Sequence, residues 1–204
     1  MTQNRSGWFK YYLGTTWMKI KGWEFEGDIP SQGKFILIGS PHTSNWDFIY
    51  FLAVIFMLRM KVSWFGKHTL FKKPFGGLMR WLGGIPIDRR NPQEIVNQIV
   101  EQFNSKENLI IAIAPAGTRK HTDYWKSGFY RIAHQAKIPI LLGYADFQKK
   151  KAGIGPMIMP TGNITKDMDM IRAFYIDIRG AHPENESTII LSEELNLRKT
   201  QDKS

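Results

Sequence analysis

The chain has 204 residues, of which 43% are hydrophobic, and it carries a formal net charge of +10. This length and composition fit a single globular domain, residues 1–204, and exclude a disordered chain. There is no cysteine, which excludes disulfides, thiolate metal sites and a cysteine nucleophile.

The N-terminal residues 1–21 are rich in aromatic and basic side chains and contain no acid. They lack the apolar core and cleavage site of a signal peptide. Two interpretations stay open: an amphipathic segment at a membrane interface, or a first helix packed on the core. We expect no transmembrane segment, because the longest apolar run, Phe48–Leu58, has 11 residues, whereas a span needs roughly 20.

Short apolar runs alternate with helical patterns along the rest of the chain. This order predicts a single α/β domain with a mostly parallel central sheet flanked by helices. From about Glu184 onward the composition becomes polar, and we expect a C-terminal tail there. The predicted strands are residues 35–39, 61–66, 84–88, 109–114, 138–144 and 154–159, and the predicted helices are residues 46–59, 70–82, 92–103, 127–137 and 167–178.

A histidine and an aspartate stand where the first predicted strand passes into the first predicted helix, in the segment Pro41–Asp47. Five helical steps rotate by about 500°, so this spacing does not place both on one helical face. They can meet if His42 lies at the strand exit and Asp47 in the first helical turn, with an N-cap among residues 43–45. A neutral imidazole so placed can take a proton from a substrate hydroxyl. A solvated loop pair is the alternative.

A basic stretch follows the first predicted helix. Residues 59–90 contain eight Lys or Arg residues and one acid, Asp88, with five aromatic residues among them. Such a mixture suits a membrane–water interface and also stacking on single-stranded nucleic acid. A solvated basic face is the third possibility.

Two glycine-containing turns end in arginine, at Arg89 and at Arg119. A guanidinium at the end of a strand can bind a phosphate through two hydrogen bonds, and Gly117 lets backbone amides approach an anion closely. Surface ion pairs are the alternative for both arginines. The other four histidines show no metal-ligand spacing, so no metal site is predicted.

Four stretches resemble, in order and spacing, the four motifs of the glycerolipid acyltransferases, the PlsC-type lysophospholipid acyltransferase family. The match covers roughly residues 35–144, the motif-bearing core. The stretches are Pro41–Asp47 for N-H-x4-D, Gly84–Arg89 for a glycine and aliphatic stretch ending in arginine, Pro115–Arg119 for P-E-G-T-R, and Ile138–Ile140 for an aliphatic-proline strand.

This resemblance implies a transferase in lipid biosynthesis. It would move a fatty acyl group from acyl-CoA or acyl-carrier protein to a hydroxyl or amine of a lysophospholipid, glycerol phosphate or related lipid. It implies no cofactor and no metal, a cytoplasmic location, peripheral contact with an anionic membrane surface, and no nucleic-acid partner. The implied residues are His42 as general base, Asp47 as its orienting partner, and Arg89, Gly117, Thr118 and Arg119 for substrate binding.

Two positions depart from the family pattern. Pro41 replaces the asparagine before the histidine, and Ala116 replaces the glutamate of the third motif. In the family that glutamate, with the arginines, helps to bind the glycerol-phosphate head of the acceptor, so its loss leaves the acceptor open. A second hypothesis is therefore a non-catalytic or altered-specificity lipid-binding protein of the same fold. A third is a basic nucleic-acid-binding module, which leaves the ordered motifs unexplained.

Overall fold

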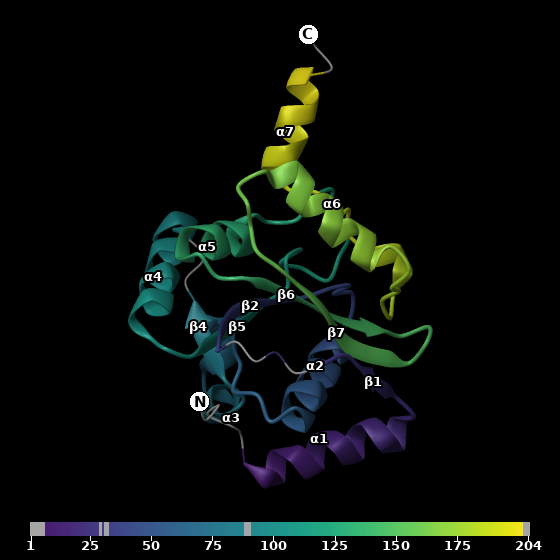
Figure 1. Cartoon of the computed structure of the whole chain (residues 1–204). Helices are drawn as coiled ribbons and strands as arrows, with labels where there is room; N and C mark the ends of the chain where they lie inside the picture. The colour runs from purple at the N-terminus through teal and green to yellow at the C-terminus, as the bar shows by residue number, and fades with distance from the viewer. Residues whose placement is uncertain (1–6, 29, 31–32, 88–90, 202–204) are drawn as a thin grey trace.

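A computed structural model describes residues 7–28, 30, 33–87 and 91–201 (Figure 1). Its strands form one sheet in the order β1-β7-β6-β2-β5-β3-β4. The strands are β1 (Glu24–Glu26), β2 (Lys34–Gly39), β3 (Ser63–Lys67), β4 (Gly84–Ile87), β5 (Leu109–Ile113), β6 (Ile140–Asp146) and β7 (Lys151–Ile158). The helices are α1 (Trp8–Lys21), α2 (Trp46–Met57), α3 (Gly76–Trp81), α4 (Pro92–Ser105), α5 (Gly128–Ala136), α6 (Ile164–Tyr175) and α7 (Ser192–Gln201), with 3-10 turns η1 (His68–Phe71) and η2 (Pro183–Asn185).

Five of the strands run parallel, which confirms the predicted fold class. β6, β2, β5, β3 and β4 pair in parallel, whereas β7 is antiparallel to β6, and β1 pairs in parallel with β7. Parallel strands present their carboxyl ends at one edge of a sheet. The segments that follow β2, β3, β5 and β6 therefore meet there, and we call this the carboxyl edge.

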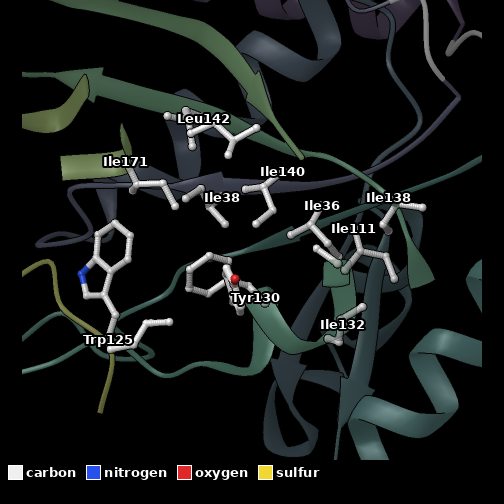
Figure 2. Packing of buried hydrophobic residues seen from close by; sticks show 14 of the residues in the cluster. Ile36, Ile38, Ile111, Trp125, Tyr130, Ile132, Ile138, Ile140, Leu142 and Ile171 are labelled. Atoms are coloured by element: carbon white, nitrogen blue, oxygen red, sulfur yellow. The ribbon is translucent and has the colours of Figure 1, made fainter. Parts of the chain in front are cut away.

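Side chains of β2 alternate between two cores because successive residues of a strand point to opposite faces. Ile36 and Ile38 pack with α4, α5 and α6, while Phe35 and Leu37 pack with α2. Figure 1 shows α4, α5 and α6 on one side of the sheet and α2 on the other, with α1 outside α2. Figure 2 shows the first of these cores, in which Tyr130 and Trp125 lie beside the isoleucines of the sheet.

Helix α1 packs on the core through one side, as the second interpretation of the N-terminal segment predicted, and is exposed on the other. One side packs on α2, where Met18 is buried with Ala53 and where Gly14 lies against the Ala53 carbonyl. The other side leaves large apolar side chains in solvent, among them Phe9 at 72% exposure. No helix in the described ranges is both long and apolar enough to cross a bilayer.

Two predicted elements differ from the structure. The helix expected over residues 70–82 is η1 followed by α3, because Pro74 lies between them and a proline disfavours a helical residue before it. The polar tail expected from Glu184 instead contains α7, and Leu191 beside it is fully buried. Glu194 of α7 accepts hydrogen bonds from the Arg172 guanidinium at 2.9 and 3.0 Å, which ties α7 to α6.

We expect Gly14→Ala to destabilise the protein, although alanine in a helix is normally favoured over glycine by about 1 kcal/mol. A Cβ at Gly14 would contact the Ala53 carbonyl oxygen and lie 2.9 Å from the Met57 nitrogen. Overpacking of this kind costs about 1–3 kcal/mol. Chemical denaturation measures the change. Gly128→Ala is the control, because a Cβ there meets no atom within 4 Å, and it should leave the unfolding free energy equal or higher.

Candidate active site

The histidine and the aspartate of the first motif are in contact. His42 lies in the segment between β2 and α2, and Asp47 is the second residue of α2. The His42 Nδ1 lies 3.1 Å from the Asp47 Oδ2, and the two side chains are 28% and 8% exposed. The strand-exit and first-turn placement predicted from the sequence is thus confirmed. With Nδ1 facing the carboxylate, Nε2 is the ring nitrogen left to meet a substrate.

The same carboxylate oxygen organises the backbone around the histidine. Asp47 Oδ2 also accepts hydrogen bonds from the Thr43 amide at 2.7 Å and the Ser44 amide at 2.8 Å. Asn45 occupies the N-cap position without a side-chain cap bond. A carboxylate in the first turn is also favoured by the helix dipole. Asp47 therefore fixes the loop that carries His42 as well as the imidazole itself.

A large cavity of about 1160 Å³ opens beside the pair, between α2 and the sheet. His42 and Asp47 line it at the carboxyl edge, and its deeper walls are apolar side chains such as Leu52, Ile55 and Ile154. These three also belong to the core between α2 and the sheet. The cavity joins a polar end, where proton transfer can occur, to an apolar chamber.

The predicted binding residues of the third motif reach the same cavity. Gly117, Thr118 and Arg119 line it together with His42. Gly117 has φ +68°, a left-handed conformation that favours glycine. Arg89, the remaining predicted binding residue, lies outside the described residues.

Two lysines that the sequence analysis did not single out also line the cavity, Lys67 and Lys120. With Arg119 they are three cationic residues among those that line the cavity, and cations of this kind suit a phosphate. Lys67 ends β3 within the basic stretch, so its place after a predicted strand was the available signal. Nothing in the pattern set Lys120 apart from other surface lysines.

Two tyrosines near the site, the buried Tyr175 and the half-buried Tyr144, support its framework. The Tyr175 hydroxyl donates to the Gly143 carbonyl at 2.9 Å and lies 3.4 Å from the Ile38 carbonyl, so it joins α6 to β6 and β2. Burial raises the pKa of Tyr175 well above its ordinary value. Burial and the neighbouring Glu26 likewise raise the pKa of Tyr144, whose hydroxyl donates to Glu26 Oε2 at 2.8 Å. Both therefore stay protonated donors at neutral pH, and sequence reasoning missed both.

Among the described residues, no group of three or more His, Asp or Glu side chains is arranged to hold a metal ion. The chemistry at hand within this part of the chain is that of an imidazole, a carboxylate and several cations.

The sequence model of the acyltransferase family matches residues 23–141, more than half of the chain. The chain belongs to the acyltransferase family. The matched region spans β1 to the start of β6 and includes the His42–Asp47 pair and the Pro115–Arg119 motif.

Two curated relatives carry the same name, 1-acyl-sn-glycerol-3-phosphate acyltransferase. The relative from Streptococcus pneumoniae is 31% identical over 113 residues, which are 55% of this chain and 42% of the relative. The relative from Haemophilus influenzae is 30% identical over 131 residues, 59% of this chain and 52% of the relative. The matches thus span about half of the length of these relatives.

A solved structure shares the fold of this chain. The 1-acyl-sn-glycerophosphate (LPA) acyltransferase PlsC from Thermotoga maritima superposes with a TM-score of 0.54 over 85% of this chain and 80% of that chain. The identity is 16%, so the likeness concerns the fold.

We expect Asp47→Ala to lower the free energy of unfolding by about 1–3 kcal/mol, because it leaves two amides and the imidazole without their acceptor. His42→Ala removes only one side-chain contact of a partly exposed residue and should cost less than about 1 kcal/mol. Urea denaturation of both variants makes the comparison. Equal losses of unfolding free energy in the two variants would contradict the role of Asp47 as the shared hydrogen-bond acceptor of the His42 loop.

Proposed function

We propose that this chain catalyses transfer of a fatty acyl group from a thioester to a hydroxyl of a glycerol-phosphate or lysophospholipid acceptor, a step of phospholipid biosynthesis. The observation that carries the proposal is the His42–Asp47 contact at the wall of a mostly apolar cavity that Arg119 and two lysines also line. Family membership and the activity for which both curated relatives are named support it.

The proposed step begins at His42. With Asp47 at Nδ1, the Nε2 lone pair accepts the proton of the acceptor hydroxyl, and the oxygen attacks the thioester carbonyl carbon. The new C–O bond forms as the C–S bond breaks, and the departing sulfur takes the proton back from the imidazolium. Asp47 stabilises that imidazolium. No covalent acyl-enzyme is required, and acyl-CoA or acyl-carrier protein supplies the thioester.

The cavity matches the two ends of such substrates. Its apolar chamber between α2 and the sheet suits a fatty acyl chain, since burying each methylene contributes about 0.8 kcal/mol. Arg119, Lys67 and Lys120, which also line the cavity, suit a phosphate. These features favour a phosphate-bearing lipid acceptor or a phosphate-bearing donor as the bound anion.

We also propose that an apolar and basic face around α1 and α3 docks on an anionic membrane. The two helices are neighbours, because Lys10 Nζ donates to the Trp81 carbonyl at 3.1 Å and lies over the Trp81 ring. Exposed apolar patches rimmed by charge mark interaction sites, and each basic residue near the lipid surface contributes about 1 kcal/mol. We call this the docking face; its exposed apolar members are Trp8, Phe9, Tyr12, Leu13, Ile20, Leu70, Phe75, Leu78 and Trp81.

We expect His42→Ala to lower acyl transfer by about 10²- to 10⁴-fold, the usual contribution of a general base. The assay gives labelled acyl-CoA or acyl-carrier protein to the purified protein with a panel of lysolipids and glycerol phosphate. His68→Ala is the matched control, because His68 is an exposed histidine of η1 and should keep full activity.

Undiminished transfer by His42→Ala would remove His42 from the mechanism. Absence of transfer by the wild type with every donor and acceptor, together with binding of lysolipid, would instead favour the non-catalytic lipid-binding hypothesis.

We expect the double variant Phe9→Ser and Phe75→Ser to reduce flotation with phosphatidylglycerol vesicles several-fold, because both side chains belong to the docking face and are 72% and 65% exposed. Ile176→Ser is the control. Ile176 is equally exposed, at 66%, and follows α6 on the other side of the sheet. If Ile176→Ser reduces flotation as much as the double variant does, the proposal that the docking face binds the membrane is contradicted. A mobility shift with DNA or RNA at physiological salt, without flotation, would favour the nucleic-acid hypothesis.

A further inference from the structure

A segment from the C-terminal part of the chain contacts the His42 loop. Residues 176–182 follow α6 and lie outside the residues 23–141 that match the family model. The His182 amide donates to the Thr43 hydroxyl at 3.1 Å. Thr43 directly follows His42 in the chain and is buried, at 4% exposure. The loop that carries the proposed base is thus in contact with a part of the chain outside the four motifs.

The segment and the loop are closely packed at Gly180. A Cβ at Gly180 would lie 2.6 Å from the Thr43 Oγ1 and 3.1 Å from the Pro41 Cβ. Both distances are shorter than the optimal contact of about 3.5–4.0 Å, so a residue without a side chain is required there. The groups that meet Thr43, the His182 amide and the Gly180 backbone, show that the segment touches the loop through its main chain.

The segment is fixed independently of the loop. The Gly180 amide donates to the Glu186 Oε1 at 2.7 Å, and the Phe147 amide donates to the Arg179 carbonyl at 2.9 Å. Phe147 lies in the turn between β6 and β7, so the second of these bonds ties the segment to the sheet. Because the segment is anchored elsewhere, its contact with Thr43 restricts the position of the loop.

Thr43 joins this segment to the proposed catalytic pair. Its amide donates to the Asp47 Oδ2 at 2.7 Å, and the same oxygen lies 3.1 Å from the His42 Nδ1. Its hydroxyl accepts from the His182 amide. One residue therefore carries hydrogen bonds to the carboxylate and to the anchored segment, and a displacement of Thr43 would alter the contact between the imidazole and the carboxylate.

We infer that the Thr43 hydroxyl is a positioning group of the acyl-transfer site. Its bond to His182 holds Thr43 where the His42 Nδ1 stays on Asp47 and the Nε2 remains free for the acceptor hydroxyl. Thr43 is not among the described residues that line the large cavity, so its hydroxyl acts on the chemical step and not on substrate binding. This inference rests on the proposed function for the reaction that His42 carries out.

Thr43→Val removes the hydroxyl and keeps the shape of the side chain, whereas Thr43→Ser keeps the hydroxyl. We expect Thr43→Val to lower the kcat of acyl transfer by about 10- to 100-fold, because a misplacement of about 1 Å can cost that much. KM should stay nearly unchanged, since substrate binding is not altered. Thr43→Ser should retain most of the wild-type kcat.

A second readout needs no substrate. At a pH where the imidazole is neutral, its nitrogen chemical shifts in NMR report which ring nitrogen carries the proton. The Asp47 carboxylate at Nδ1 selects the form that is protonated there. We expect this form of His42 in the wild type and in Thr43→Ser, and a mixture of the two forms in Thr43→Val.

Thr161→Val controls for a general loss of stability. The Thr161 hydroxyl donates to the Asp167 Oδ1 at 2.9 Å, but Thr161 lies between β7 and α6, at the opposite edge of the sheet. This variant should keep the wild-type kcat and the wild-type imidazole signals. Thermal melting shows whether each variant is folded. If Thr43→Val does not fold, Gly180→Ala replaces it, because the new Cβ displaces the same hydroxyl.

A folded Thr43→Val with the kcat and the imidazole spectrum of the wild type would overturn the inference. An equal loss of kcat in Thr161→Val would do the same, because the effect would then be one of stability. If the wild type transfers no acyl group with any donor or acceptor, the proposed function fails. The imidazole spectrum, which is recorded without substrate, then still decides whether Thr43 positions His42.

Discussion

One carboxylate oxygen holds the candidate site together. Asp47 Oδ2 accepts from the His42 imidazole and from the amides of Thr43 and Ser44, all within 3.1 Å. These bonds join the end of β2, the loop and the start of α2 into one unit. Because α2 also walls the large cavity, the element that sets the base orientation also shapes the apolar chamber beside it. A shift of α2 would disturb both.

The parts of the fold that sequence reasoning predicted are those with strong local patterns. The apolar runs of β2, β5 and β6 predicted buried strands because a strand buried on both faces of a sheet demands such side chains. The missed elements depend on partners far along the chain. β1 is three residues with two glutamates and exists through pairing with Lys151–Gly153 of β7. α7 is polar, and its place is set by Arg172 and by the burial of Leu191.

The residues of the candidate site likewise divide into those that the sequence predicted and those that depend on partners far along the chain. His42 and Asp47 are five residues apart, so a local argument about strand and helix placement was sufficient to bring them together. Arg119 joined them because parallel strands end at one edge, a property of the fold class. The positions of Tyr144 and Glu186 could not be predicted by either argument. They depend on which strands are neighbours in the sheet and on the direction of β7. The sequence predicted β7 as a strand, and the short connection between the predicted strands 138–144 and 154–159 was a signal for its reversal, because a parallel crossover needs about a dozen residues or more.

That reversal has a consequence for how such a site can change over time. β7 starts at the carboxyl edge and runs away from it, so α6 must return the chain to that edge before residues 176–191 cross behind the His42 loop. These residues belong to no strand of the parallel core, and surface segments tolerate substitution better than buried strands do. The fold thus places the proposed base and the residues behind its loop on different parts of the chain, so each part can be substituted independently of the other where the two are not in contact. Residues 176–191 can therefore change while the central strands stay as they are.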